Sequence, residues 1–404
     1  MALPRPKHRN PLRPLGLLKP VIRIASLPTL LKTRFSFTQE RMELVGNQPC
    51  LILMNHSSFT DLKIVHRIFP GSLSIVSTMD SLVGMPWLLR LVGCIPTQKF
   101  VSDLTLIRDM NYALKTRKSS VVMFPEAGYT LDGRGMTLPR YLGVLLKRFK
   151  VPVVMVTTWG AFARDPLYNG LQKRRVKVSA HVKCLLTPEE IGDKSINELH
   201  AIIGEAFTFD QFAWQRDNRV IIDESFRADG LHRVLYHCPD CGTIGRMEGK
   251  GIRLTCHACG KVHGMNVYGQ LMALEGQTRF PHIPDWFDWQ RTQVEQEVSA
   301  GTYRLDVPVR IAMLVDYKAL YMVGEGRLVH DESGFRLTGC DGKLDYQQAN
   351  TACHSLNVDY YWYEIGDMIS IGNRDALYYC FPQDGTSVTR ARLAAEAFYR
   401  LQKA

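Results

Sequence analysis

The sequence predicts a mixed α/β domain in which helices flank a sheet, followed by a cysteine-rich ribbon and a small β-rich domain that ends in a helix. Three observations support this architecture. In the first half of the chain, short apolar runs typical of buried strands, such as 51–54 and 119–124, end in polar residues. Two Cys-X-X-Cys pairs occupy the middle. After residue 303, β-type runs alternate with Gly and Asp turns, and an apolar stripe over 387–402 predicts a final helix.

At 404 residues the chain is long enough for several domains. The segments that we expect are a basic amphipathic arm over 1–36, the α/β domain over 37–225, the ribbon over 232–268, a helical connector over 269–302 and the β-rich domain over 303–404. No apolar run reaches the ~18 residues that would predict a transmembrane helix. The N-terminal residues also lack the apolar block of a signal peptide. Antiparallel strands closed by one terminal helix make the β-rich domain similar in outline to pleckstrin-homology domains.

His56 and Asp61 form the first candidate site. The strand predicted at 51–54 ends in Asn55 and His56, and the two serines that follow are N-cap types, so a helix is expected to begin just after the histidine. Residues five apart do not share one face of a regular helix, which turns about 100° per residue. They can meet if His56 lies on the loop and Asp61 points back from the first turn. An imidazole held in this way suits a general base that takes a proton from a hydroxyl.

Four blocks in this order resemble those of the 1-acylglycerol-3-phosphate acyltransferases and related glycerolipid acyltransferases, over about residues 37–210. The blocks are 55–61, 93–99, 124–126 and 151–154. The resemblance implies transfer of a fatty acyl group from a thioester donor, acyl-CoA or acyl carrier protein, to a glycerol hydroxyl of a lysophospholipid. The acceptor that it implies is 1-acylglycerol-3-phosphate. His56 would then be the base and Asp61 its orienting partner.

The same resemblance implies a binding site for the acceptor. The residues that it assigns to this site are Asn55, Lys99, Glu126 and Gly128. Two departures weaken the phosphate-binding part of the pattern. The family usually has arginine where Lys99 stands, and Ala127 and Tyr129 replace the usual glycine and arginine of the third block. Arg134 and Arg140 are candidates for the missing charge, although arginines of this kind more often lie on the surface.

The second candidate site consists of Cys238, Cys241, Cys256 and Cys259. Each pair encloses two residues, so one tight turn can aim both thiolates at one ion, and the fourteen residues between the pairs can form a hairpin. Four thiolates leave no coordination position open, which predicts a structural zinc ion in a zinc ribbon. The other six cysteines are scattered singly, which indicates a reducing compartment.

The net charge of +11 is unevenly distributed, because residues 1–34 contain eight basic residues and no acidic one. Leucines are interleaved with them, which predicts an interfacial anchor on an anionic membrane surface. The alternative is a helix packed on the α/β domain, with Pro20 and Pro28 dividing it into pieces. Together with the reducing compartment, the anchor predicts a cytoplasmic protein, peripheral on the inner face of the membrane.

A different function class is a zinc-ribbon nucleic-acid-binding protein without acyltransferase activity. Its basis is the pI of 9.1 and three basic residues in the ribbon hairpin, Arg246, Lys250 and Arg253. The hairpin lacks clustered aromatic residues that stack on bases, and much of the positive charge lies in the N-terminal arm. Nucleic acid is therefore not the expected partner.

Overall fold

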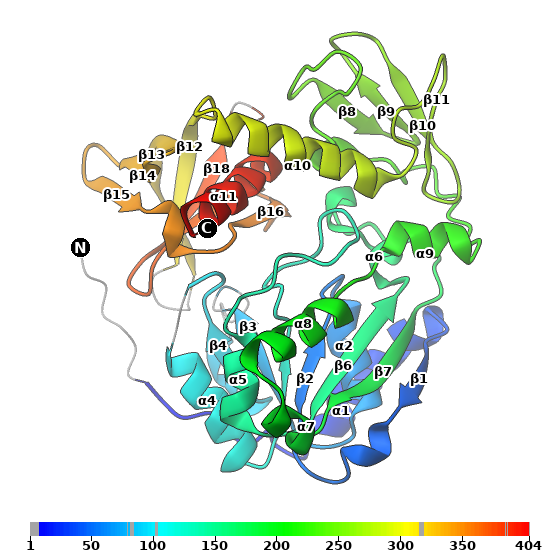
Figure 1. Cartoon of the computed structure of the whole chain (residues 1–404), viewed down its shortest axis with the longest axis vertical. Coiled ribbons are helices and arrows are strands. Elements are labelled where there is room, and N and C mark those ends of the chain that lie inside the picture. The colour runs from blue at the N-terminus through cyan, green and yellow to red at the C-terminus, as the bar shows by residue number, and fades with distance from the viewer. Residues whose placement is uncertain are drawn as a thin grey trace.

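The computed structural model describes residues 8–78, 80, 85–101, 104–314, 319–383, 385 and 387–403. These residues form three sheets of seven, four and seven strands in chain order. Figure 1 shows the four-stranded and second seven-stranded sheets above the first sheet. No helix among the described residues is long and apolar enough to cross a membrane.

The first sheet has the strand order β1-β7-β6-β2-β5-β3-β4. Its strands are β1 (Ser36–Glu40), β2 (Leu51–Met54), β3 (Leu73–Thr78), β4 (Cys94–Thr97), β5 (Ser120–Met123), β6 (Val153–Trp159) and β7 (Ser179–Leu186). Only β6 and β7 pair in antiparallel fashion, so the sheet is mixed, as predicted. The carboxyl ends of the parallel strands meet at one edge, where open α/β sheets place their sites.

Helices cover both faces of this sheet. They are α1 (Leu18–Lys32), α2 (Thr60–Ile68), α3 (Pro86–Leu91), α4 (Leu104–Lys115), α5 (Leu142–Phe149), α6 (Ala161–Arg164), α7 (Pro188–Asp193), α8 (Ile196–Ala206) and α9 (Gln211–Asp217). Alternate residues of β2 point to opposite faces. Leu51 and Leu53 pack with α4, α5 and α8, whereas Ile52 and Met54 pack with α2 and the buried Leu30 of α1.

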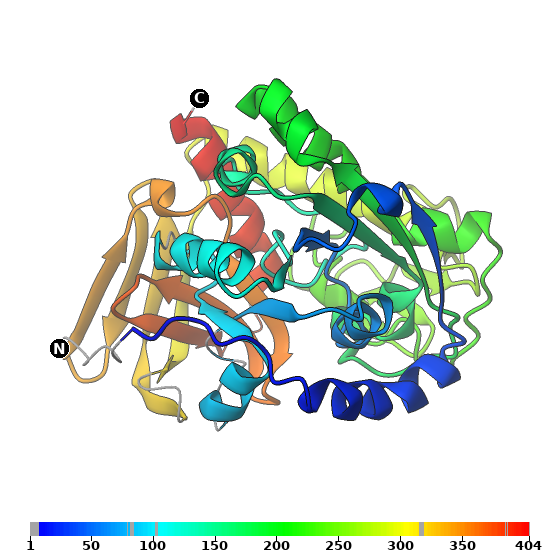
Figure 2. The same ribbon diagram turned by 90° about the horizontal axis from the view of Figure 1, so that it is seen from below.

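The N-terminal arm contains one continuous helix, α1, which corrects the expectation that prolines divide it. Pro28 lies inside the helix. One face of α1 is buried at Ser26 and Leu30. The other face leaves Ile24 and Leu31 66% and 72% exposed. One face of α1 therefore packs on the domain and the other is exposed, while the membrane contact stays a prediction. The helix lies along one edge of the molecule in Figure 2.

The ribbon sheet consists of β8 (Met247–Lys250), β9 (Arg253–Cys256), β10 (Val262–Met265) and β11 (Leu271–Ala273). It extends beyond the predicted boundary at 268, because β11 pairs with β10 and buries Leu271. The predicted connector helix is α10 (Ile283–Ser299), which runs from the ribbon across the top of Figure 1. Trp286 of α10 is buried, and its indole N–H donates to the carbonyl of His237.

The C-terminal sheet is antiparallel and has the order β15-β14-β13-β12-β18-β17-β16, so that two meanders join where β12 pairs with β18. Its strands are β12 (Leu305–Leu314), β13 (Leu320–Asp331), β14 (Gly334–Gly339), β15 (Leu344–Gln348), β16 (Asn357–Trp362), β17 (Gly366–Gly372) and β18 (Leu377–Pro382). The terminal helix, α11 (Val388–Lys403), packs against α10. A β-rich domain closed by a helix is thus confirmed. Strand β15 escaped prediction because the side chains of this edge strand are mostly polar.

Candidate active site

The loop after β2 brings His56 and Asp61 together, as the sequence predicted. His56 Nδ1 lies 3.1 Å from Asp61 Oδ2. The same carboxylate oxygen accepts from the backbone N–H groups of Ser57 and Ser58, at 2.8 and 2.9 Å. Asp61 is buried, whereas His56 lines a cavity. Because an ionised carboxylate only accepts, His56 Nδ1 carries the proton and Nε2 keeps a lone pair for another partner.

Glu126 ties this loop to the chain beyond β5. Its Oε2 accepts from the backbone N–H of His56 at 3.1 Å, and its Oε1 accepts from that of Met136 at 2.8 Å. The side chain is buried, and burial raises the pKa of Glu126 to about 8, although the two backbone hydrogen bonds lower it. Glu126 therefore fixes where the His56 backbone lies.

Asn55 has a similar structural task between β2 and β6. Its Oδ1 accepts from the backbone N–H of Thr158 at 2.8 Å, and its Nδ2 donates to the carbonyl of the same residue at 3.3 Å. Asn55 is fully buried. Neither Asn55 nor Glu126 is among the described residues that line the cavity. The hydrogen bonds of both side chains go to the backbone of neighbouring segments, and their contact with the acceptor stays a prediction.

The cavity beside His56 has a volume of about 1120 Å³. The apolar part of its lining comes from β3, α4, β5 and α5 and includes Ile75, Leu106, Ile107, Met110, Met123 and Leu145. Lys99 and Gly128, both predicted for the acceptor site, also line it. An apolar cavity of this size with a few polar groups suits a lipid-like ligand.

Aromatic residues of the third block pack against His56. The ring of Tyr129, which stands where the family usually has arginine, lies 4.3 Å from that of His56, and the ring of Phe124 lies 4.1 Å from it. Burial raises the pKa of Tyr129. Of the two arginines considered as replacements, Arg140 lines the cavity. Arg134 does not, because it pairs with Asp132 and Asp288.

Sequence reasoning missed the contribution of the C-terminal domain to this cavity. The segments Thr351–His354 and Asp359–Tyr363 line it, together with Arg374 and Tyr399. No local motif marks these residues, since they reach the cavity only through the packing of one domain on another. The one signal in the sequence is the aromatic run at 360–363, and the structure leaves Tyr361 and Tyr363 exposed.

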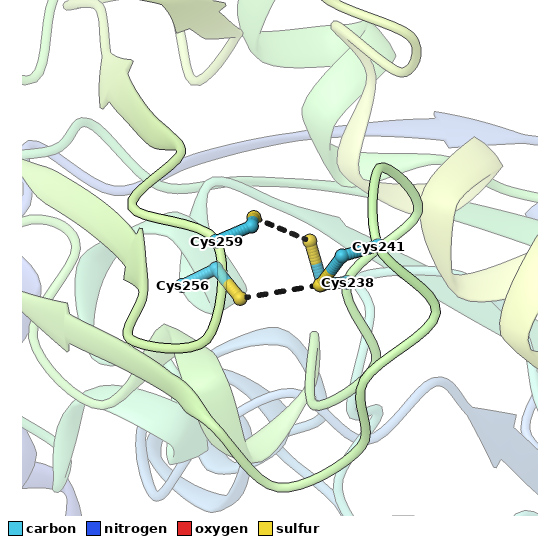
Figure 3. Close-up of side chains that lie close together, drawn as sticks. All are labelled: Cys238, Cys241, Cys256 and Cys259. Carbon is cyan, nitrogen blue, oxygen red and sulfur yellow. Dashed lines mark hydrogen bonds between the residues drawn. The ribbon is translucent and has the colours of Figure 1, made fainter.

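The side chains of the four cysteines point toward one another from the two Cys-X-X-Cys turns (Figure 3). Cys238 Sγ lies 3.9 Å from Cys259 Sγ, and Cys241 Sγ lies 3.8 Å from Cys256 Sγ. All four sulfur atoms lie within 4.8 Å of one another. Zinc bound tetrahedrally at about 2.3 Å separates its sulfur ligands by about 3.8 Å, so the spacing fits one such ion.

Comparison with known proteins identifies an acyltransferase segment in the first half of the chain. Residues 34–159 match the model of the acyltransferase family. This segment belongs to that family. The acyltransferase domain thus spans β1 to β6 and contains both His56 and Asp61.

One solved structure to which the chain is similar is the 1-acyl-sn-glycerophosphate (LPA) acyltransferase PlsC from Thermotoga maritima. The identity is 17%, the TM-score is 0.38, and the match covers 47% of this chain and 76% of that chain. No curated protein matches this chain.

Proposed function

We propose that the acyltransferase domain transfers a fatty acyl group from an acyl thioester to a glycerol hydroxyl of a lysophospholipid, with His56 as the general base. The observation that carries this proposal is the bond from His56 Nδ1 to the buried Asp61, at the edge of a large apolar cavity. This bond leaves Nε2 as the ring nitrogen that can accept a proton.

In this reaction His56 Nε2 takes the proton of the acceptor hydroxyl while the hydroxyl oxygen attacks the thioester carbonyl carbon. A carbon–oxygen ester bond forms and the carbon–sulfur bond breaks, with its electron pair leaving on sulfur. The imidazolium then returns the proton to the thiolate, which departs as a thiol. Asp61 stabilises the imidazolium and keeps the ring in one orientation.

The substrates are proposed from the resemblance and the cavity lining. Both acyl-CoA and acyl carrier protein present a thioester, and the apolar lining suits the acyl chain. The acceptor implied by the resemblance is 1-acylglycerol-3-phosphate. Its phosphate would contact Lys99 and Arg140, which both line the cavity. Gly128 lines the cavity close to His56, where it leaves room for the glycerol.

The membrane contact remains a proposal for the exposed face of α1. That face presents Ile24 and Leu31, on a segment with eight basic residues and no acidic one among residues 1–34. Apolar side chains and cations together favour an anionic bilayer surface. We place the protein on the inner face of the membrane, as a peripheral protein in the cytoplasm.

We also propose that the four cysteines hold one structural zinc ion. With all four thiolates bound, the ion has no open position for substrate. Its task would be to hold the ribbon against α10, since the backbone of His237, next to Cys238, accepts from Trp286 of α10.

The reaction is tested by replacing the base. His56→Ala should lower acyl transfer by about 10²- to 10⁴-fold, the usual contribution of a general base. Purified protein would be assayed with acyl-CoA and acyl carrier protein and several lysophospholipids, with products identified by mass spectrometry. His200→Ala is the matched control, because His200 lies on α8 and does not line the cavity. Near-normal turnover by folded His56→Ala would refute the mechanism.

A further inference from the structure

Two domains enclose the active-site cavity. The acyltransferase wall contains His56, Lys99 and the apolar lining described above. The C-terminal wall consists of Thr351–His354, Asp359–Tyr363, Arg374 and Tyr399. A lysophospholipid bound at His56 therefore lies between the two walls.

Contacts across the cavity rim fix the C-terminal wall in place. The hydroxyl of Tyr363 donates to the carbonyl of Asp80 at 2.9 Å. Arg374 Nη2 donates to Thr105 Oγ1 at 3.0 Å. The His354 ring lies edge-on to that of Phe100, with 5.5 Å between centroids. The second domain is thus docked on the first by hydrogen bonds and ring contacts at several points.

Asp359 carries a carboxylate of the C-terminal wall close to the catalytic centre. Burial raises the pKa of Asp359 to about 6, while the charge of Lys99 lowers it. The charge of Asp359 also contributes to the raised pKa of Tyr129, whose ring packs on His56. Asp359 and Lys99 therefore interact electrostatically across the cavity that both of them line.

Charged side chains line the cavity on both walls. Apart from histidines, those among its described lining residues are Asp80, Lys99, Arg140, Asp359 and Arg374. Lys99 and Asp359 are thus opposite charges on opposite walls of one cavity. A phosphate monoester carries a charge of about −1.5 to −2 at pH 7. A phosphodiester carries one negative charge, and its second substituent can offer hydroxyl or ammonium donors to a carboxylate.

We propose that the C-terminal wall is the second half of the acceptor site, and that Asp359 selects a lysophosphodiester over a lysophosphate monoester. The hydroxyl- or amine-bearing group on the phosphate of such an acceptor donates to Asp359, while Lys99 contacts the phosphate. A monoester would instead place a second negative charge against Asp359. This inference rests on the proposed acyl transfer, and it replaces 1-acylglycerol-3-phosphate, the acceptor that the resemblance implies, with a lysophosphodiester as the preferred acceptor.

The test compares acceptors within one preparation of the full chain. We expect kcat/KM to be at least about tenfold higher with lysophosphatidylglycerol or lysophosphatidylethanolamine than with lysophosphatidate. Asp359→Asn should lower kcat/KM for the diesters by about 10- to 100-fold and spare the monoester, because a hydrogen bond to a charged group is lost. Asp345→Asn is the matched control, since Asp345 pairs with Arg336 on the surface of the same domain.

The ratio between acceptors separates selection from folding. A partly unfolded Asp359→Asn sample loses activity with every acceptor equally, whereas loss of selection changes the ratio. A wild-type preference for lysophosphatidate, or an unchanged ratio in Asp359→Asn, would overturn the proposal and leave the acyl transfer standing. Absence of acyl transfer to all three acceptors, with both thioester donors, would instead count against the proposed function itself.

The ratio of kcat/KM for diesters to that for the monoester should depend on pH. Because the pKa of Asp359 is about 6, its carboxylate gains a proton as the pH falls below that value and the preference for diesters declines. The groups whose charges act on Asp359 are Lys99, Asp80 and Asp367, and Asp359 in turn acts on Tyr129.

Discussion

The two walls of the cavity differ in how their polar groups are held. On the acyltransferase wall, backbone N–H groups of two neighbouring loops fix the carboxylates of Asp61 and Glu126, and these fix His56. On the C-terminal wall, Asp359 accepts from the backbone N–H of Tyr360, but the wall itself depends on contacts between domains. If both proposals hold, the reacting groups lie on one hydrogen-bonded loop, whereas the choice of acceptor depends on how the two domains pack together.

The docking of the C-terminal wall depends in turn on α11. Glu396 of this helix is buried and accepts from Arg392, Arg291 and Ser355. Arg392 also contacts the sulfur of Met136 at 2.8 Å. Because the N–H of Met136 is bound to Glu126, α11 reaches the loop that positions His56. Variants of the acyltransferase wall should therefore change kcat for all acceptors, whereas variants of the C-terminal wall should change the ratio of kcat/KM between acceptors.

The largest effect is expected from loss of the zinc ion that we propose for the ribbon. Cys238→Ser with Cys259→Ser should abolish zinc binding, which contributes an apparent free energy of about 10–16 kcal/mol in small zinc domains. The ribbon should unfold, α10 should lose its support, and thermal unfolding should begin at a lower temperature. Elemental analysis and calorimetry would measure both effects. Cys340→Ser is the control. If elemental analysis finds no zinc in wild-type protein purified under reducing conditions, the prediction is wrong.

The next effect tests the acyltransferase wall. Asp61→Asn should lower kcat by about 10²- to 10⁴-fold, because the amide no longer stabilises the imidazolium of His56. Asp61→Asn should lower kcat equally for all acceptors, whereas Asp359→Asn should affect the diesters alone. Measuring kcat with one diester and one monoester would distinguish the two results. If Asp61→Asn instead changes the ratio of kcat/KM between diesters and the monoester, the two walls do not have separate roles.

A smaller effect is expected from the ion pairs of α11. Glu396→Gln should lower the free energy of unfolding by about 3–5 kcal/mol, because Arg392 and Arg291 are left without their buried partner. KM for the acceptor should rise more than kcat falls, since docking of the C-terminal wall weakens. Denaturant unfolding and steady-state kinetics would measure these changes. Glu332→Gln, at an exposed position of the same domain, is the control.

Low pH should lower the free energy of unfolding of the wild type in the same way as Glu396→Gln. Burial favours a raised pKa for Glu396, but Arg392 and Arg291 lower it from the ordinary 4.5 to about 2. The stability contributed by the ionised carboxylate is therefore present above the ordinary value and is lost as the pH falls towards 2. Unfolding free energy measured across this range should fall less in Glu396→Gln than in the wild type.

The smallest effect concerns α1, which serves neither wall directly. Ile24→Glu with Leu31→Glu should leave stability within about 0.5 kcal/mol, because both side chains are exposed. Sedimentation with anionic liposomes should weaken, since two apolar contacts worth about 1.5–3 kcal/mol each are lost. Ile221→Glu is the control, at an exposed position distant in sequence. Unchanged sedimentation would leave α1 as a packing element only.

The sequence alone determined the features that depend on neighbouring residues. His56 and Asp61 meet because a strand end and a helix start lie within five positions. The cysteine pairs meet because each lies on one tight turn. The helix α8 begins after Ser195, a residue type that caps helices, and its side chain accepts from Glu198 N. Such contacts depend on local geometry that residue types in a fixed pattern specify.

Only the tertiary structure decided which residues face the cavity. Glu126 lies 70 positions from His56 and was expected to touch the acceptor, but the packing of two strand ends turns it toward backbone N–H groups. Tyr363 and Asp80 are 283 positions apart and meet only because one domain docks on another. Contacts at such separations depend on the shape of whole surfaces, and no local pattern of residues specifies that shape.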